Sequence, residues 1–235
     1  MSNVKIFYDK IYRSEGFKAQ RLYPNEELLR FLGVNFFSKT VKKDRKNIKV
    51  LEVGCGSCAN LWMISKEGFD AYGIDISKEA LNLGQQMLGN WQVKANLQIG
   101  DFLELPYENE NFDIIIDVIS MYCVNHQDSI KGISEVYRTL KKGGLFFAYE
   151  ASKNSSVFKD YLPAKKIDEH TLDGVHRKTS PFYGNKHAFH FWDKEEFRSA
   201  LINKGFSVEY LETTRKSYYQ NTEQFEYLTV YARKI

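Results

Sequence analysis

The feature that most constrains the fold is an alternation of short apolar runs with helix-like stretches between residues 49 and 151. The runs that predict strands are Lys49–Gly54, Asp70–Ser77, Asn96–Phe102, Phe112–Met121 and Leu145–Ala151. Apolar residues at helical spacing separate several of them, at Asn60–Gly68, Lys78–Leu88 and Ser129–Gly144. Strands that alternate with helices favour right-handed crossovers and a mostly parallel sheet with helices on both faces.

This rhythm breaks after Ala151. Residues 152–191 contain no strong periodic run, but they carry four histidines and several aromatic residues. A helix is expected over Trp192–Gly205, and two alternating runs, Phe206–Thr214 and Phe225–Lys234, predict strands that pair antiparallel. The length of the chain is that of one domain, which we expect to span residues 1–235.

The first strand ends in the sequence VLEVGCGSCAN (Val50–Asn60), a turn with two glycines. Gly54 and Gly56 allow the backbone to approach a ligand with no Cβ in the way, and the N–H groups that start the next helix would point at it. A tight turn that binds nothing would explain the same two glycines. Glu52 beneath the turn would disfavour a pyrophosphate and suit a cationic ligand, or it is a structural acid that ties the loop down.

Two further acids follow successive strands. Asp75 ends the second strand, where a carboxylate can bind a ribose diol, and Asp101 ends the third, where it can accept a hydrogen bond from adenine. Phe102 stands beside Asp101 and can cover the ring. Together, the glycine turn and the two acids predict a site that binds a nucleoside.

The composition is that of a globular protein, with 43% hydrophobic residues, 27% charged residues and a formal net charge of +3. The basic stretch Lys39–Lys49 is interpreted as a solvated connection and not as a nucleic-acid patch. No apolar run approaches the roughly 20 residues of a membrane span, and the N-terminus is too polar for a signal peptide. We expect a cytoplasmic monomer or homodimer with no nucleic-acid or membrane partner.

Neither the cysteines nor the histidines predict a metal site. Cys55 and Cys58 have the spacing of a redox or metal motif, but they lie inside the glycine turn and no second pair exists. The histidines after Ala151 match no standard zinc spacing, so we expect no metal; they are His170, His176, His187 and His190.

In combination, these motifs resemble those of the class I S-adenosylmethionine-dependent methyltransferases. The matching segments, in the order and spacing of that family, are VLEVGCGSCAN, GIDIS, GDFLELPY, FDIIIDVISMYCV and LKKGGLFFAYE. The resemblance covers about residues 45–151 closely and the C-terminal strands loosely. It implies an α/β, three-layer Rossmann-like fold with a seven-stranded, mostly parallel sheet whose last strand is antiparallel.

The resemblance also implies a cofactor, S-adenosyl-L-methionine, and its contacts. Gly54 and Gly56 would pass under its methionine part, and Asp75 would bind both ribose hydroxyls. The other positions that match the family are Ile76, Asp101 and Phe102 for the adenine, and Asp117 and Val118 for the sulfonium and amino-acid end. The segment AQRLYPNEELLRFL (19–32) resembles an N-terminal helical lid, about residues 1–44. Tyr12 and Arg21 are then candidates for the cofactor carboxylate, unless they belong to a surface helix and its salt bridges.

The candidates for catalysis are Tyr122 and His126, just after the fourth strand, and His190. Residues 152–191 are expected to cover the substrate, because a long segment at this place is usually functional. Its side chains, with two between the C-terminal strand runs, predict a cationic, aromatic pocket, and they are His170, His176, Arg177, Tyr183, Lys186, His187, Arg215 and Tyr218.

We therefore expect S-adenosylmethionine-dependent methyl transfer to a small acidic or phosphorylated molecule, at oxygen, by in-line displacement. The chain is similar to bacterial methyltransferases of small-metabolite or surface-polysaccharide pathways. No Asn-Pro-Pro-Tyr-like tetrapeptide follows the fourth strand, which disfavours a nucleic-acid substrate. The alternatives are an NAD-dependent oxidoreductase and a non-catalytic partner protein that binds S-adenosylmethionine.

Overall fold

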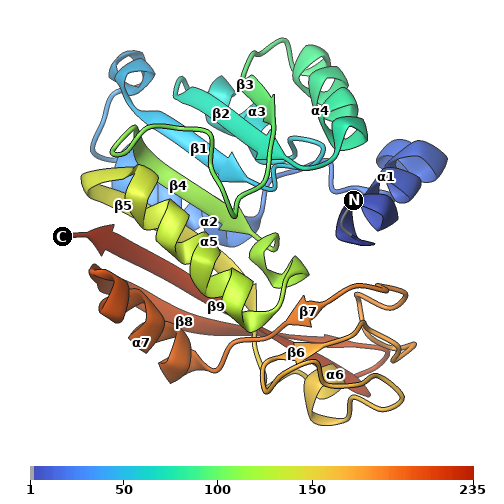
Figure 1. Ribbon diagram of the computed structural model, residues 1–235. Coiled ribbons are helices and arrows are strands. Elements are labelled where there is room, and N and C mark those ends of the chain that lie inside the picture. The colour runs from blue at the N-terminus through green and yellow to red at the C-terminus, as the bar shows by residue number, and fades with distance from the viewer. Residues whose placement is uncertain (1–2) are drawn as a thin grey trace.

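A seven-stranded sheet organises the protein, of which a computed structural model describes residues 3–235 (Figure 1). Its strands are β1 (Lys49–Val53), β2 (Asp70–Asp75), β3 (Asn96–Ile99), β4 (Phe112–Val118), β5 (Leu140–Ala151), β8 (Phe206–Tyr218) and β9 (Glu223–Lys234). They lie in the order β3-β2-β1-β4-β5-β9-β8. The first five pair in parallel, and β9 runs antiparallel to both β5 and β8. The predicted α/β fold with an antiparallel last strand is confirmed.

Helices cover both faces of this sheet and complete three layers. One face packs against α2 (Glu26–Leu32), α3 (Leu61–Lys66) and α4 (Lys78–Asn90), and the other against α5 (His126–Thr139) and α7 (Lys194–Lys204). Figure 1 shows α5 and α7 in front of the sheet and α2 behind it. Successive side chains of a strand point to opposite faces. Val50 and Phe147 therefore join the apolar cluster of the first face, whereas Leu51 and Phe146 join that of the second.

Helix α5 begins and ends earlier than the expected Ser129–Gly144. The Asn125 side chain caps it by accepting a backbone N–H of the first turn at 2.9 Å. The helix ends at Thr139, and the chain continues from Leu140 directly into β5, where Leu140 pairs with Phe112. The two glycines that were expected to stop the helix lie within β5 instead. Glycine disfavours helix, and the pairing of β5 with β4 already begins at Leu140, before the glycines.

Two segments lie at the end of the sheet toward which β1 and β4 point (Figure 1). The first holds α1 (Asn3–Glu15) and η1 (Gly16–Ala19). From there the chain passes along the first face through α2 and η2 (Gly33–Phe37), and η3 (Lys42–Asn47) leads into the start of β1. The second, between β5 and α7, holds α6 (Ser156–Lys159) and the pair β6 (Thr171–Leu172) and β7 (Phe189–His190), while η4 (Met121–Cys123) follows β4. No helix within residues 3–235 is long and apolar enough to cross a membrane.

Candidate active site

A cavity of about 1010 Å³ opens at the carboxyl ends of β1, β2 and β4, against α1. Its walls come from the loops after β1, β2, β3 and β4 and from Pro181, Phe182, Tyr183, Asn185 and Ala188. The predicted cofactor residues that line it are Tyr12, Arg21, Glu52, Gly54, Gly56, Asp75, Ile76, Asp101, Phe102 and Val118. Segments far apart in the chain thus converge at the edge where parallel sheets bind their ligands.

The turn after β1 presents bare backbone to this cavity. Gly54 and Gly56 have φ angles of +60° and +51°, which strain any residue that carries a Cβ. A Cβ on Gly54 would also collide with the Ser120 side chain, and one on Gly56 would lie 3.1 Å from the Tyr12 hydroxyl. Helix α3 begins only at Leu61, later than expected, so residues 57–59 form part of the turn. Both glycines are required by this close approach.

Asp75, the last residue of β2, braces the turn. Its Oδ2 accepts the backbone N–H of Gly56 at 2.9 Å, and its Oδ1 accepts that of Ser77 at 2.8 Å. Burial raises the pKa of this carboxyl, and the two backbone N–H groups oppose the rise. Since two carboxylate oxygens offer about four lone pairs, Asp75 can hold the turn and also accept two ligand hydroxyls.

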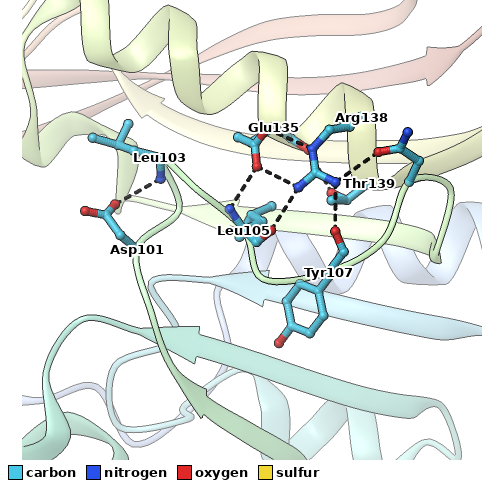
Figure 2. Close-up of polar contacts among 8 residues, drawn as sticks. Asp101, Leu103, Leu105, Tyr107, Glu135, Arg138 and Thr139 are labelled. Carbon is cyan, nitrogen blue, oxygen red and sulfur yellow. Dashed lines mark hydrogen bonds and ion pairs between the residues drawn. The ribbon is translucent and has the colours of Figure 1, made fainter.

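The loop after β3, which carries Asp101, is clamped to α5 (Figure 2). Arg138 donates to the backbone carbonyls of Leu105 at 2.8 Å and Tyr107 at 2.7 Å. Glu135 accepts the backbone N–H of Leu105 at 2.8 Å and pairs with Arg138 at 2.7 Å. The hydrogen bond from Arg138 lowers the pKa of Glu135. The clamp therefore fixes the loop that presents Asp101 to the cavity.

Glu52 lies in β1 beneath the glycine turn. Its Oε1 accepts a hydrogen bond from the Asn60 side chain at 2.5 Å, whereas its buried Oε2 has no hydrogen-bond partner within residues 3–235. Burial raises the pKa of Glu52 to about 8, and the positive charge of Arg21 is among the influences that oppose the rise. A buried polar atom is rarely left unbonded, so the free oxygen at the cavity wall suits an N–H donor of a ligand.

Asp117 is fully buried and is not among the cavity-lining residues, although its neighbour Val118 is. Its carboxylate accepts hydrogen bonds from the side chain and the backbone N–H of Ser120, and it is paired with Glu150 of β5. Burial raises the pKa of both carboxyl groups. The pair supports Ser120, which lines the cavity, from below.

A second group of lining side chains is aromatic and consists of Phe7, Tyr8, Tyr122, Phe182 and Tyr183. The hydroxyls of Tyr8 and Tyr122 are 2.6 Å apart, and burial raises the pKa of both well above the usual value. The buried ring of His187 packs against both, with centroids 5.5 and 6.3 Å away. Its Nδ1 lies 2.7 Å from the carbonyl of Ala188, and its Nε2 has no partner within residues 3–235.

Known proteins share this architecture. A profile described as a methyltransferase domain matches residues 50–144. The chain is 26% identical over 211 residues to demethylmenaquinone methyltransferase of Staphylococcus aureus, which covers 87% of this chain and 82% of that protein. It is also 26% identical over 146 residues to sterol 4-C-methyltransferase of Caenorhabditis elegans, covering 61% of this chain and only 42% of that protein. Magnesium protoporphyrin IX methyltransferase from Synechocystis PCC 6803, solved with bound S-adenosylmethionine, has the same fold, with a TM-score of 0.66, 14% identity and coverage of 100% and 99%.

Residues 50–144 form a methyltransferase domain of the class I S-adenosylmethionine-dependent type. Its activity is methyl transfer to a small molecule, with S-adenosylmethionine as the cofactor. The cavity fits this cofactor, because Gly54 and Gly56 leave a cradle that a Cβ would fill and Glu52 has a free oxygen for its amino group. The oxidoreductase alternative is therefore abandoned.

The methyltransferase does not bring the predicted cationic residues together at the cavity. Arg177 pairs with Asp160 and Glu223 at 2.5 Å each, and Arg215 pairs with Glu226 at 2.8 Å. The other predicted acceptor residues that are not among the cavity lining are His126, His170, His176, Lys186, His190 and Tyr218. Of the residues predicted to face the acceptor, Tyr122 and Tyr183 line the cavity. His187 lies directly behind this wall, with its ring against that of Tyr122.

Sequence reasoning missed the cavity face of α1 and the clamp on α5. The lining residues of α1 are Val4, Phe7, Tyr8, Ile11, Tyr12 and Glu15, at spacings of one helix face. That spacing was an available signal, as were the opposite charges of Glu135 and Arg138 three positions apart. Asn60 and Ser120 also line the cavity, but single polar residues in loops gave no pattern to read.

Proposed function

We propose that this methyltransferase transfers the methyl group to a hydroxyl oxygen of a small, uncharged molecule that contains an apolar ring. The supporting observation is the aromatic wall, whose members are Phe7, Tyr8, Tyr122, Phe182 and Tyr183. Arg21 is the one cation among the lining residues within 3–235, and its charge acts on Glu52 at the cofactor end. An acidic or phosphorylated acceptor, as the sequence led us to expect, would lose its hydration here without gaining a countercharge.

The names of two relatives are in keeping with an apolar ring compound, but not with transfer to oxygen, since the Caenorhabditis elegans name specifies a 4-C position. Demethylmenaquinone and sterol, the acceptors in the names of the Staphylococcus aureus and Caenorhabditis elegans proteins, are both largely apolar ring compounds. These names describe the relatives, and for this chain they support the class of acceptor only.

The cofactor supplies, when bound, a methyl group that its sulfonium charge has already activated. The chain has to hold the acceptor in line with that group and exclude water, because positioning supplies much of the rate in a reaction of two bound molecules. The Asp75 carboxylate and the glycine turn would hold the cofactor. Helix α1 would act as the lid of the N-terminal segment through Tyr8 and Tyr12, and residues 152–191 would close the acceptor end with Phe182 and Tyr183.

A hydroxyl acceptor loses its proton as the new O–C bond forms, and a base assists that step. His187 suits this task, since Nδ1 faces the carbonyl of Ala188 and leaves the unpartnered Nε2 with the lone pair. Burial lowers the pKa of His187, which keeps the ring neutral. We place His187 as the proton acceptor and Tyr122, predicted as catalytic, as a donor that orients the acceptor oxygen. The predicted catalytic residues His126 and His190, like His187, are not among the lining residues, but unlike His187 they make no ring contact with Tyr8 or Tyr122 within residues 3–235.

The proposal is tested with purified protein, radiolabelled S-adenosylmethionine and matched acceptors, a hydroxylated aromatic ring and the same ring bearing a carboxylate or a phosphate. We expect turnover of the neutral ring, and a fall in kcat for His187→Gln with unchanged affinity for S-adenosylhomocysteine. Lys186→Ala and Arg215→Ala are matched controls that should leave both acceptors unaffected. If the charged rings are turned over faster than the neutral ring, and if Lys186→Ala and Arg215→Ala lower that turnover, the acceptor is acidic and the proposal is wrong. Cofactor binding with no turnover of any ring would refute a hydroxylated ring as the acceptor.

A further inference from the structure

Three histidines from separate segments meet beside the cavity. His126 opens α5, His170 precedes β6, and His190 ends β7. One ring nitrogen of each lies within 4.8 Å of those of the other two. Nδ1 of His126 and Nε2 of His190 are 3.0 Å apart, and the ring of His170 stacks on that of His126 with centroids 3.8 Å apart. The cluster adjoins the active site, because Asn125 and Asp128, on either side of His126, line the cavity.

Ring packing leaves some of the hydrogen-bonding nitrogens of these three histidines without partners. The contact between His126 and His190 is the one side-chain hydrogen bond that the three rings make within residues 3–235. Nδ1 of His170 and Nδ1 of His190 are buried and have no hydrogen-bond partner in that part of the chain. Each imidazole can ligate one ion through one nitrogen, so an ion bound by Nε2 of His190 would leave its Nδ1 unbonded. The convergence of three ring nitrogens within 4.8 Å, from three separate segments, is what indicates a further binding partner.

Two carboxylates accompany the cluster. Oε2 of Glu196 on α7 lies 3.5 Å from Nδ1 of His170. Asp168 accepts the backbone N–H groups of His126 at 3.2 Å and His170 at 2.7 Å, which fixes it in the same loop. Lys153 is the nearby cation, and it is bonded to Glu196 at 2.9 Å. Carboxylates commonly support the imidazole ligands of a metal, so this charge pattern suits a dication.

We propose that His126, His170 and His190 bind one divalent transition-metal ion, for which zinc is the best fit. Zinc binds imidazole nitrogen at about 2.0–2.1 Å with tetrahedral geometry, which places two ligand nitrogens roughly 3.3 Å apart. The separation of 3.0 Å between His126 and His190 is already close to that value. His170, whose side chain is 13% exposed and whose ring stacks on that of His126, has to rotate for one of its nitrogens to complete this arrangement. The fourth position would belong to water or to Glu196.

Such an ion would tie residues 152–191 to α5 and so fix the acceptor wall. The metal site does not depend on which molecule accepts the methyl group. Histidine spacing argued against a metal because it compared residues within one segment. The third ligand, His126, comes from outside that segment, whereas His176 and His187 lie elsewhere.

The test uses the full chain without a histidine tag, stripped of metal with a chelator that is then removed. Zinc is titrated by calorimetry, and cobalt by the visible absorption of its tetrahedral complex. We expect one equivalent to bind and the thermal midpoint to rise. His126→Gln and His170→Gln should each weaken binding by about 100-fold or more, since loss of a supporting partner alone costs about 10–100-fold. His176→Gln, a histidine of the same segment outside the cluster, is the matched control and should bind as the parent does.

Affinity for S-adenosylhomocysteine reports on folding, and it should be unchanged in all three variants. The proposal fails if zinc binds to less than one equivalent. It also fails if folded His126→Gln and His170→Gln retain the parent affinity, or if His176→Gln loses as much as they do.

Discussion

Replacement of Glu52 by Gln is expected to remove a pH-dependent destabilisation of the cofactor-free protein. Glutamine keeps the carbonyl oxygen that accepts the Asn60 hydrogen bond, but it cannot ionise. In the parent protein, ionisation leaves a buried charge at a group whose pKa burial has raised from 4.5 to about 8. The folded state therefore holds this proton more tightly than the unfolded state does.

The sign and size follow from that difference. Glu52 imposes no penalty below the unfolded pKa of 4.5, and its penalty grows as the pH rises through the interval up to about 8. At 1.36 kcal/mol for each unit, the free energy of unfolding should fall by about 3.5 kcal/mol between pH 5 and pH 8 through this group alone. Other groups titrate in the same range, so the quantity to compare is the difference between parent and Glu52→Gln.

The assay is urea denaturation followed by tryptophan fluorescence at several pH values from 5 to 8, at constant ionic strength and without cofactor. From pH 5 to pH 8, the free energy of unfolding of Glu52→Gln should rise by about 3.5 kcal/mol relative to that of the parent. Glu108→Gln, at an exposed position, is the control and should stay within about 0.5 kcal/mol of the parent. A difference between parent and Glu52→Gln that stays constant with pH would refute the raised pKa and with it the buried, half-satisfied carboxyl.

The other predictions concern the cofactor and acceptor ends of the cavity. Asp75→Asn should raise the dissociation constant of S-adenosylhomocysteine by about 10–100-fold in calorimetry, because charged hydrogen bonds contribute about 1.5–3 kcal/mol; unchanged affinity would contradict the ribose role. Gly54→Ala should lower the free energy of unfolding in urea by about 1–3 kcal/mol, because its φ is +60°. Arg138→Met should free the loop after β3 and weaken the same ligand, with a matched loss of protection in hydrogen exchange at residues 101–107. Tyr122→Phe should lower kcat while cofactor affinity is kept, and equal loss of both would place Tyr122 at the cofactor.

Much of the fold was predictable because each signal is local. The apolar strand runs, the glycine turn and the acids at two strand ends depend on the nearest neighbours along the chain, and they predicted the sheet and the cofactor edge. The error at the end of α5 has the same origin. Gly143 and Gly144 read locally as a helix stop, but strand pairing from Leu140 onward decided the boundary.

The acceptor end was less predictable, since it depends on which distant segments come together. Arg177 and Arg215 looked available in the sequence, yet Glu223 and Glu226 of β9 neutralise them in the fold. The aromatic wall joins α1, the turn after β4 and residues 182–183, which no pattern along the chain connects.

From the sequence came the alternation of elements, the glycine turn and the carboxylates that mark a cofactor edge, because backbone conformation and strand order depend on short-range patterns. Tertiary structure alone decided the raised pKa of Glu52, the orientation of His187 and the meeting of His126 with two histidines of a later segment. These properties depend on burial and on contacts between residues far apart in the chain, which emerge only when the sheet and its two flanking segments close around one cavity.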